Sequence, residues 1–407
     1  MNLLIHEHVS GGGCTKEIIS ASILSEGYAM LRSLIADFKA AGHQVTTLLD
    51  SRLAGFNPPL EAEVVQISSP RGLEEKFREL SGMVDAVYVV APESGQVLEK
   101  LVKKIESSGG TSLNCQFDAI KRVSNKMKTY ETLKKRGVKV PETVMLSIHE
   151  KTRNISRLTK ELEYPLIFKP LDGISCRGLS LVKDEGSIVA AVKKVAHQSM
   201  SNYFLVQESI RGTAASVCIF STGKKALAVT LNRQFVTLEP PDGESRYSGG
   251  AVPFLHSLDE EAFKTAQRAV EMIGGLKGYV GVDVLLTEEG PVVIEINPRL
   301  TTSYTGLRKV AVFNVAQAIV DATLSRKLPK TNSLEGYALF QKVEVPLCPQ
   351  IITETYKLKE VLSLPFPIKG NKSAYALLVT SSTSPKGAQS AFYRARRSLL
   401  KLFGESD

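Results

Sequence analysis

The chain has 407 residues, 43% of them hydrophobic and 23% charged, with five cysteines and a formal net charge of +9. These proportions are ordinary for a soluble globular protein of several compact units. No apolar run reaches the roughly 18 to 20 residues of a membrane span, and the cysteines form no Cys-x-x-Cys pair. We therefore expect a cytoplasmic protein with neither a disulfide framework nor a zinc site.

The positive charges are scattered along the chain. The clearest cluster runs from Lys386 to Lys401, where apolar residues recur at helical spacing between the basic ones. This pattern predicts an amphipathic C-terminal helix with a solvated basic face. We expect neither nucleic acid nor a membrane as a partner.

The first part of the chain alternates strand and helix. Leu3 to Ile5 and Val45 to Leu49 are strand-like, and Ile23 to Ala41 between them has the apolar spacing of a helix. Strand, helix and strand in succession predict a parallel α/β unit.

Ligands of such sheets bind beyond the carboxyl ends of the strands. One such end follows the first strand, and another follows a later strand, Val84 to Val90. The run Gly11 to Gly13 nearby is not a GxGxxG fingerprint, so it indicates no dinucleotide site. The substrate-pocket candidates at these ends are Glu7 and Glu93, with His6 and His8 less favoured.

A glycine-bounded loop follows next. The predicted helix Asn125 to Arg136 begins with Lys126, and the predicted strand Tyr164 to Pro170 carries Lys169 just before the loop Gly173 to Gly178. A loop of this kind between two strands can fold over phosphates, and a lysine on the entering strand supplies a positive charge. By itself the signal is weak, because most strand lysines beside turns are structural.

The next strand, Leu205 to Ile210, contains the polar pair Gln207 and Glu208, which can hydrogen-bond a base edge, although an edge-strand Glu needs no such role. Antiparallel strands then lead to a predicted long loop, Glu239 to Pro253. Long loops in compact regions are more often functional than neutral. Substrate candidates in and beside this loop are Arg233, Tyr247 and Gly249.

Two strand-like runs, Tyr279 to Leu286 and Pro291 to Asn297, are joined by a short polar turn that ends in Gly290. This is the pattern of a β-hairpin. Alternation directs Asp283, Glu295 and Asn297 to one face. The opposite, apolar face is predicted to contain Val280, Val282, Val284, Leu286, Val292, Ile294 and Ile296.

The polar face of this hairpin predicts a metal site. With the turn centred on Glu289, Asp283 lies directly across from Glu295, and two carboxylates that close repel each other unless a cation sits between them. An oxygen-only set with a carboxamide suits Mg²⁺, whose coordination substrate phosphates usually complete. The alternative is a hairpin with one solvated face, which explains most acidic residues on strands.

The remainder of the chain is predicted to be helical from Leu307 to Leu328, with strands at Tyr337 to Val345 and Ala374 to Thr380 before the basic helix. The order of all these features resembles the ATP-grasp superfamily over residues 1–320. The matching stretches are SNKMKTYETLKKRGVKVPET, YPLIFKPLDGISCRG, LVQESIRG, GYVGVDV and VVIEINPRL.

The resemblance implies a mixed α/β ATP-grasp fold with four parts. Residues 1–117 would form a Rossmann-like pre-ATP-grasp domain, and residues 118–206 a small ATP-grasp subdomain with a phosphate lid. Residues 207–330 would form the large subdomain with the metal site. Residues 331–407 would be a small α/β extension that packs on the large subdomain.

The resemblance also implies roles in ATP binding. Lys126 and Lys169 would contact the phosphates, and Gly173, Ser175 and Gly178 would belong to the lid over them. The residues on the adenine side would be Gln207 and Glu208.

In the same way, Asp283, Glu295 and Asn297 would hold two Mg²⁺ ions, with Mn²⁺ as an alternative. Arg299 and Lys169 would be the catalytic residues, with Arg299 stabilising the transferring phosphoryl group. The family commonly holds the ribose with an acidic residue where this chain has Ala215, so ribose binding is unassigned.

Within the superfamily, the opening IHEHVSGGG, the stretch VAPESGQVLEKL and the lid look most like the tyramine–glutamate ligase group of methanofuran biosynthesis. This resemblance implies small-molecule partners: a carboxylate phosphorylated by ATP, and an amine that displaces phosphate to form an amide. Glu7, Glu93 or Glu26 would accept the amine proton or hold an ammonium. The alternatives are another branch of ATP-grasp ligases, amino-acid ligase or carboxylase-like, or a nucleotide-binding protein without turnover. A homodimer is also compatible with the sequence.

Overall fold

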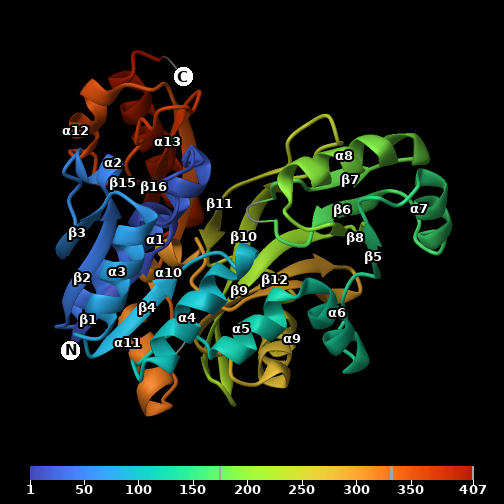
Figure 1. Cartoon of the computed structure of the whole chain (residues 1–407), viewed down its shortest axis with the longest axis horizontal. Coiled ribbons are helices and arrows are strands. Elements are labelled where there is room, and N and C mark those ends of the chain that lie inside the picture. The colour runs from blue at the N-terminus through green and yellow to red at the C-terminus, as the bar shows by residue number, and fades with distance from the viewer. Residues whose placement is uncertain (174–175, 331–332, 406–407) are drawn as a thin grey trace.

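The computed structural model describes residues 1–173, 176–330 and 333–405. Within these residues the strands form three sheets, in the orders β3-β2-β1-β4, β5-β8-β6-β7 and β13-β12-β9-β10-β11-β14-β16-β15. Figure 1 shows β9, β10 and β12 of the eight-stranded sheet between the N-terminal sheet and the small sheet, whereas β15 and β16 lie on the side of the N-terminal sheet. The predicted mixed α/β architecture is confirmed. No helix in the described ranges is long and apolar enough to cross a membrane.

The N-terminal sheet is parallel, as predicted, because β1 pairs in parallel with both β2 and β4. Sequence reasoning missed β3 and α3. In β3 only the last residue, Ile67, is fully buried, so β3 lacks the alternating burial of a typical strand. The elements are β1 Asn2–Glu7, η1 Val9–Gly13, α1 Ala21–Ala40, β2 Gln44–Asp50, α2 Ser51–Ala54, β3 Glu63–Ile67, α3 Pro70–Ser81, β4 Ala86–Val90, η2 Ser94–Gln96 and α4 Val97–Ser107.

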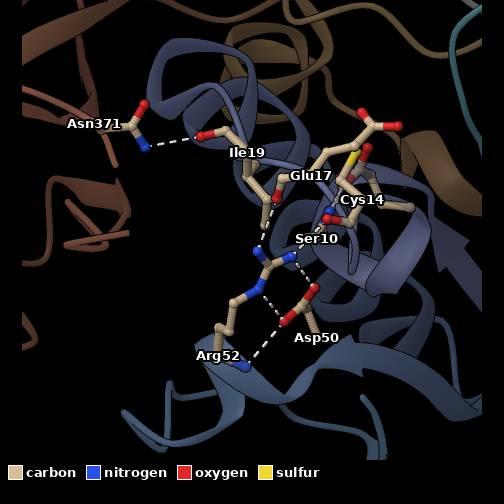
Figure 2. A network of polar contacts seen from close by, with 8 residues as sticks. Ser10, Cys14, Glu17, Ile19, Asp50, Arg52 and Asn371 are labelled. Atoms are coloured by element: carbon tan, nitrogen blue, oxygen red, sulfur yellow. Dashed lines mark hydrogen bonds and ion pairs between the residues drawn. The ribbon is translucent and has the colours of Figure 1, made fainter. Parts of the chain in front are cut away.

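Hydrogen bonds and an ion pair fix the loop that leads into α1 (Figure 2). Arg52 of α2 donates to the backbone oxygen of Cys14 at 2.8 Å and pairs with the buried carboxylate of Asp50 at 2.7 Å. From the C-terminal part of the chain, Asn371 donates to the backbone oxygen of Ile19 at 2.8 Å. The segment that leads into α1 is therefore held by hydrogen bonds from α2 and from the C-terminal part of the chain.

The small sheet is antiparallel and is covered by α7 and α8, whose apolar residues share its core. At the start of α6 the side chain of Asn125 accepts a hydrogen bond from the backbone N–H of Lys128 at 3.0 Å, a helix cap that sets Lys126 in the first turn. The elements are α5 Phe117–Ser124, α6 Lys126–Lys135, β5 Thr143–Ser147, α7 Thr152–Leu158, β6 Leu166–Pro170, β7 Ser180–Val182, η3 Glu185–Ser187, α8 Ile188–Gln198 and β8 Tyr203–Glu208.

The large sheet begins as predicted, but the predicted loop Glu239 to Pro253 is wrong in its second half, which is strand β11. Gly249 lies so close to β14 that a Cβ there would stand 2.1 Å from the carbonyl oxygen of Phe340. The glycines that suggested a loop are what allow this strand to approach its neighbour. The elements of this part are β9 Thr213–Thr222, β10 Ala226–Thr237, β11 Arg246–Val252, α9 Asp259–Ile273, β12 Lys277–Thr287 and β13 Gly290–Asn297.

The predicted continuous helix Leu307 to Leu328 is also wrong, because it is broken after Val310 and restarts where Asn314 caps α11. The rest of the chain adds three strands to the large sheet, and the predicted basic helix is confirmed as α13, with Phe392 and Leu399 buried. The elements are α10 Tyr304–Val310, α11 Val315–Val320, η4 Asp321–Ser325, β14 Tyr337–Val345, η5 Pro349–Ile351, α12 Ile352–Thr355, β15 Val361–Ser363, β16 Ala374–Ser382 and α13 Pro385–Leu402.

Candidate active site

The hairpin of β12 and β13 places two carboxylates opposite each other. Asp283 pairs with Glu295 in the ladder, which confirms the predicted register at this point. Asn297 donates a hydrogen bond to one carboxylate oxygen of Asp283 at 3.1 Å, and Gln234 of β10 donates to the other at 2.9 Å. Three predicted ligands therefore lie on one face, together with an amide that sequence reasoning did not single out.

The predicted apolar face of this hairpin needs a correction. The register shifts after Asp283, so that Val293 lies opposite Val284 and joins the core. The assignment of Val292 and Ile294 to the core face is wrong, and Ile294 instead lines a pocket beside Glu295. The physical reason is a bulge, since one extra residue in a strand reverses the side-chain alternation beyond it.

Two lysines, Lys126 and Lys169, supply positive charge beside the two carboxylates of the hairpin. Burial raises the pKa of Asp283 to about 6, and the negative charge of Glu295 acts in the same direction. Burial also opposes ionisation of Glu295, but the positive charges of Lys126 and Lys169 outweigh it and lower the pKa of Glu295. Lys126 reaches Glu295 at 3.1 Å and the backbone oxygen of Gly173 at 3.2 Å.

Lys169 stands on β6, opposite Leu205 of β8, with a side chain that is almost fully buried. Burial and the neighbouring positive charge of Lys126 lower the pKa of Lys169 to about 8. A buried ammonium without an anion beside it is costly, so an arriving phosphate would favour the charged form.

We expect ATP affinity to depend on pH through Lys169. Because its pKa is lowered, Lys169 loses its charge as the pH rises through about 8, so the affinity should fall by about tenfold per unit above that pH. Calorimetric titration with a non-hydrolysable ATP analogue and Mg²⁺, between about pH 7 and about pH 9.5, measures this. The Lys169→Met variant should bind more weakly and without this dependence. Constant wild-type affinity across the range would contradict the expectation.

A pocket lies between the small sheet and the hairpin. Apolar residues of α6, β8 and β13 line it together with Lys126, Lys169, Gln207 and Glu295. Gln207 donates to the hydroxyl of Thr143 at 2.7 Å. Glu208 is not among its lining residues and accepts a backbone hydrogen bond from Glu142 at 2.9 Å.

Arg299 follows the hairpin and pairs with Glu93, from Nε to the carboxylate, at 3.0 Å. Its charge also acts on Asp283, Glu295 and Glu7 and favours their ionised forms. Glu7 and Glu93, two of the three predicted acids of the N-terminal domain, therefore lie near Arg299. Burial raises the pKa of Glu7, although Glu7 accepts hydrogen bonds from the backbone and hydroxyl of Ser10.

The two less favoured candidates, His6 and His8, do not line the pocket beside the hairpin. His6 is fully buried with its ring against Phe77, and neither of its ring nitrogens has a hydrogen-bond partner in the part of the chain that the structure describes. A Cβ at Gly11 would lie 2.7 Å from the His6 ring, and one at Gly13 would lie 2.2 Å from the His8 ring. The glycine run makes room for these rings, which explains it without a ligand.

The remaining candidates differ in their surroundings. Arg233 is exposed and lies 5.7 Å from the ring centroid of Phe254. Tyr247 of β11 lies opposite Val236 of β10, and burial raises the pKa of Tyr247, as do the charges of Glu26 and Asp283. Gly249 has the packing role described above. Ser175 lies outside the described residues, which contain Gly173 and Gly178 at the two ends of the lid.

Among the residues that the structure describes, no three or more His, Cys, Asp or Glu side chains gather in a way that could hold a metal. The hairpin instead offers two carboxylates and a carboxamide. Such a set is too small to surround Mg²⁺ by itself and fits a site in which phosphates and water supply the other ligands.

Comparisons with known proteins agree with this geometry. Residues 123–303 match a family model described as an ATP-grasp domain, and residues 43–120 match one described as a pre ATP-grasp 3 domain. An ATP-grasp superfamily protein from Archaeoglobus fulgidus shares the fold, with a TM-score of 0.62 and 23% identity over 93% of this chain and 99% of that one. The fold and the site together define an α/β enzyme that uses a nucleotide.

Two named relatives are similar to this chain over most of their length. The tyramine–L-glutamate ligase of Methanocaldococcus jannaschii is 32% identical over 70% of this chain and 80% of its own. That of Methanocaldococcus fervens is 32% identical over 75% of this chain and 89% of its own. The chain belongs to the ATP-grasp family, as predicted, and is a carbon–nitrogen ligase of the ADP-forming type.

Proposed function

We propose that the protein joins a carboxylate to an amine by way of an acyl phosphate, with ATP as the phosphoryl donor. The observation that carries this proposal is the cross-strand pair of Asp283 and Glu295, which faces Lys126 and Lys169 beside a pocket. Paired, partly buried carboxylates opposite two lysines suit Mg²⁺ and phosphates together, and they have no evident use in a protein that only stores a nucleotide.

The residues around the hairpin fit divalent metal, because the negative charge of Glu295 disfavours ionisation of Asp283 and a cation between them would relieve this. Asp283, Glu295 and Asn297 would hold Mg²⁺, which would neutralise phosphate charge and align the γ-phosphate. Mn²⁺ has similar ligand preferences.

The chain's own groups would position the reactants. Lys126 and Lys169 would bind the phosphates, Gln207 would face the base in the pocket, and Arg299 would stabilise the charge of the transferring phosphoryl group. A carboxylate oxygen attacks the γ-phosphorus and ADP leaves. The amine then attacks the acyl carbon, loses a proton and expels inorganic phosphate. Positioning and charge neutralisation are sufficient for these steps.

We further propose that the acid is the side-chain carboxylate of glutamate and the amine is tyramine, which would place the enzyme in methanofuran biosynthesis. The support is the identity to the two tyramine–L-glutamate ligases, each covered over more than two thirds of its length.

An oxygen-18 experiment tests the mechanism. With labelled glutamate carboxylates, tyramine and ATP, one labelled oxygen should appear in the released inorganic phosphate, because a carboxylate oxygen leaves with the phosphoryl group. Mass spectrometry of the phosphate measures it. Label in AMP, together with released pyrophosphate, would refute the acyl-phosphate mechanism. Label in phosphate only with a different acid would keep the ligase and remove glutamate as its substrate.

A further inference from the structure

A buried polar cluster lies where the two ends of the chain meet the large sheet. Lys342 of β14 reaches the carboxylate of Glu26 on α1 at 2.6 Å and the hydroxyl of Ser22 at 2.8 Å. The side chains of this ion pair are only 7% and 9% exposed. The second oxygen of Glu26 accepts a hydrogen bond from Thr302 at 2.8 Å.

This cluster lies next to the segment that follows the hairpin, because Thr302, its hydrogen-bond partner, stands three residues after Arg299. Burial raises the pKa of Cys176, within the predicted lid, to about 12, and the charges of Glu26 and Asp283 act in the same direction. Lys342 also lies 5.7 Å from the ring centroid of Tyr247, whose pKa responds to the same two acids. One cation and one anion therefore stand within electrostatic range of the hairpin.

The attachment of the C-terminal extension to α1 does not by itself explain the ion pair of Lys342 and Glu26. Arg32, two turns further along α1, already joins this helix to the extension by donating to the backbone oxygens of Val361 and Leu362 at 2.9 and 3.1 Å. A buried ion pair is weak evidence for stability, because desolvation of both charges offsets their attraction. A pair beside the reaction centre can instead exchange partners with a substrate.

We propose that Lys342 and Glu26 bind the charged head group of an amino-acid substrate, with Lys342 contacting the α-carboxylate and Glu26 the α-ammonium. The inference rests on the proposed function, in which the side-chain carboxylate of the same amino acid is phosphorylated. A zwitterion carries the same two opposite charges as the ion pair, so each protein charge finds a new partner when the substrate enters. Ser22 and Thr302 keep the two side chains oriented.

This arrangement predicts selectivity against acids that lack either charge. An acid without the α-carboxylate leaves Lys342 unmatched, and one without the α-ammonium leaves Glu26 unmatched. Buried polar groups left unpaired are what give a site strong discrimination. The C-terminal extension would then supply a specificity residue to a site built mainly by the ATP-grasp core.

The test compares glutamate with 4-aminobutyrate, which lacks the α-carboxylate, and with glutarate, which lacks the α-ammonium, by ADP release in the presence of tyramine. Lys342→Met should reduce the preference for glutamate over 4-aminobutyrate in kcat/KM by at least about tenfold. Glu26→Gln should reduce the preference over glutarate by a similar factor. The KM for ATP should change little in either variant, because neither residue lines the pocket beside Lys126 and Lys169.

Arg32→Met is the matched control, since it removes a contact between the same helix and the same extension without facing the site. It should keep both preferences. A folded Lys342→Met variant with the wild-type preference would overturn the inference and leave the proposed function standing. If the wild type releases no ADP with glutamate and tyramine, the proposed function falls. The inference is then decided by glutamate binding in the presence of the ATP analogue and Mg²⁺, and equal binding by wild type and Lys342→Met overturns it.

Discussion

Glu295→Gln is expected to lower the ATP-dependent ligation rate by about 10²- to 10³-fold or more while leaving the fold intact. Glutamine preserves the size of the side chain but removes the charge that lies directly opposite Asp283 and 3.1 Å from Lys126. The substitution would thus remove a proposed Mg²⁺ ligand and the partner of a proposed phosphate-binding lysine. ADP release at saturating substrates, measured over a range of Mg²⁺ concentrations, tests it.

Glu288→Gln provides the control for this experiment. Glu288 is an exposed acid in the turn of the same hairpin, so its variant should retain the wild-type rate. Circular dichroism and thermal unfolding would show that both variants are folded. A folded Glu295→Gln protein with a near wild-type rate at low Mg²⁺ would remove the metal assignment.

Arg299→Ala is expected to lower the rate by about 10³-fold, in the range seen when an arginine that stabilises a transferring phosphoryl group is lost. The guanidinium lies 3.0 Å from Glu93 and acts electrostatically on Asp283 and Glu295, between the N-terminal domain and the hairpin. Arg299→Lys should recover part of the rate, because it restores the charge without the planar geometry of the guanidinium. Single-turnover measurement of ADP formation separates this effect from product release.

A loss of stability could lower the rate of Arg299→Ala for a different reason, since Glu93 is left without its partner. Arg308→Ala separates the two effects. Arg308 also belongs to a buried ion pair, with its Nε 2.9 Å from Asp37, but lies on α10 outside the proposed site. This variant should unfold at a lower temperature and yet keep the rate per folded molecule. Equal losses of rate in Arg299→Ala and Arg308→Ala, at equal loss of stability, would refute a catalytic role for Arg299.

The sequence by itself determined the family and the main features of the hairpin. A strand alternates with a period of two, and a short turn ending in Gly290 fixes which residues of two adjacent strands face each other, so the opposition of Asp283 and Glu295 followed from local spacing. The same kind of local pattern predicted the parallel N-terminal sheet and the basic C-terminal helix. Which of these residues bind ATP and metal stays a prediction.

Other features were decided only by the tertiary structure. The alternation of apolar and polar residues along a strand does not reveal where a bulge occurs. Val292 and Ile294, at and beyond the bulge, were therefore assigned to the wrong face. The glycines near Gly249 suggested a loop because the close approach of β14, which they permit, is invisible in sequence.

The pair of Lys342 and Glu26 shows this limit most clearly. The two residues are 316 positions apart, and although Glu26 was a predicted substrate acid, no local pattern distinguishes Lys342 from a surface charge or pairs it with Glu26. Their contact exists because β14 extends the large sheet while α1 packs against its neighbouring strands, so that apolar burial far from either residue brings the two charges together. The spacing of residues along the chain specifies which side chains of adjacent elements face each other. The packing of the common core decides which distant charges come together in one site.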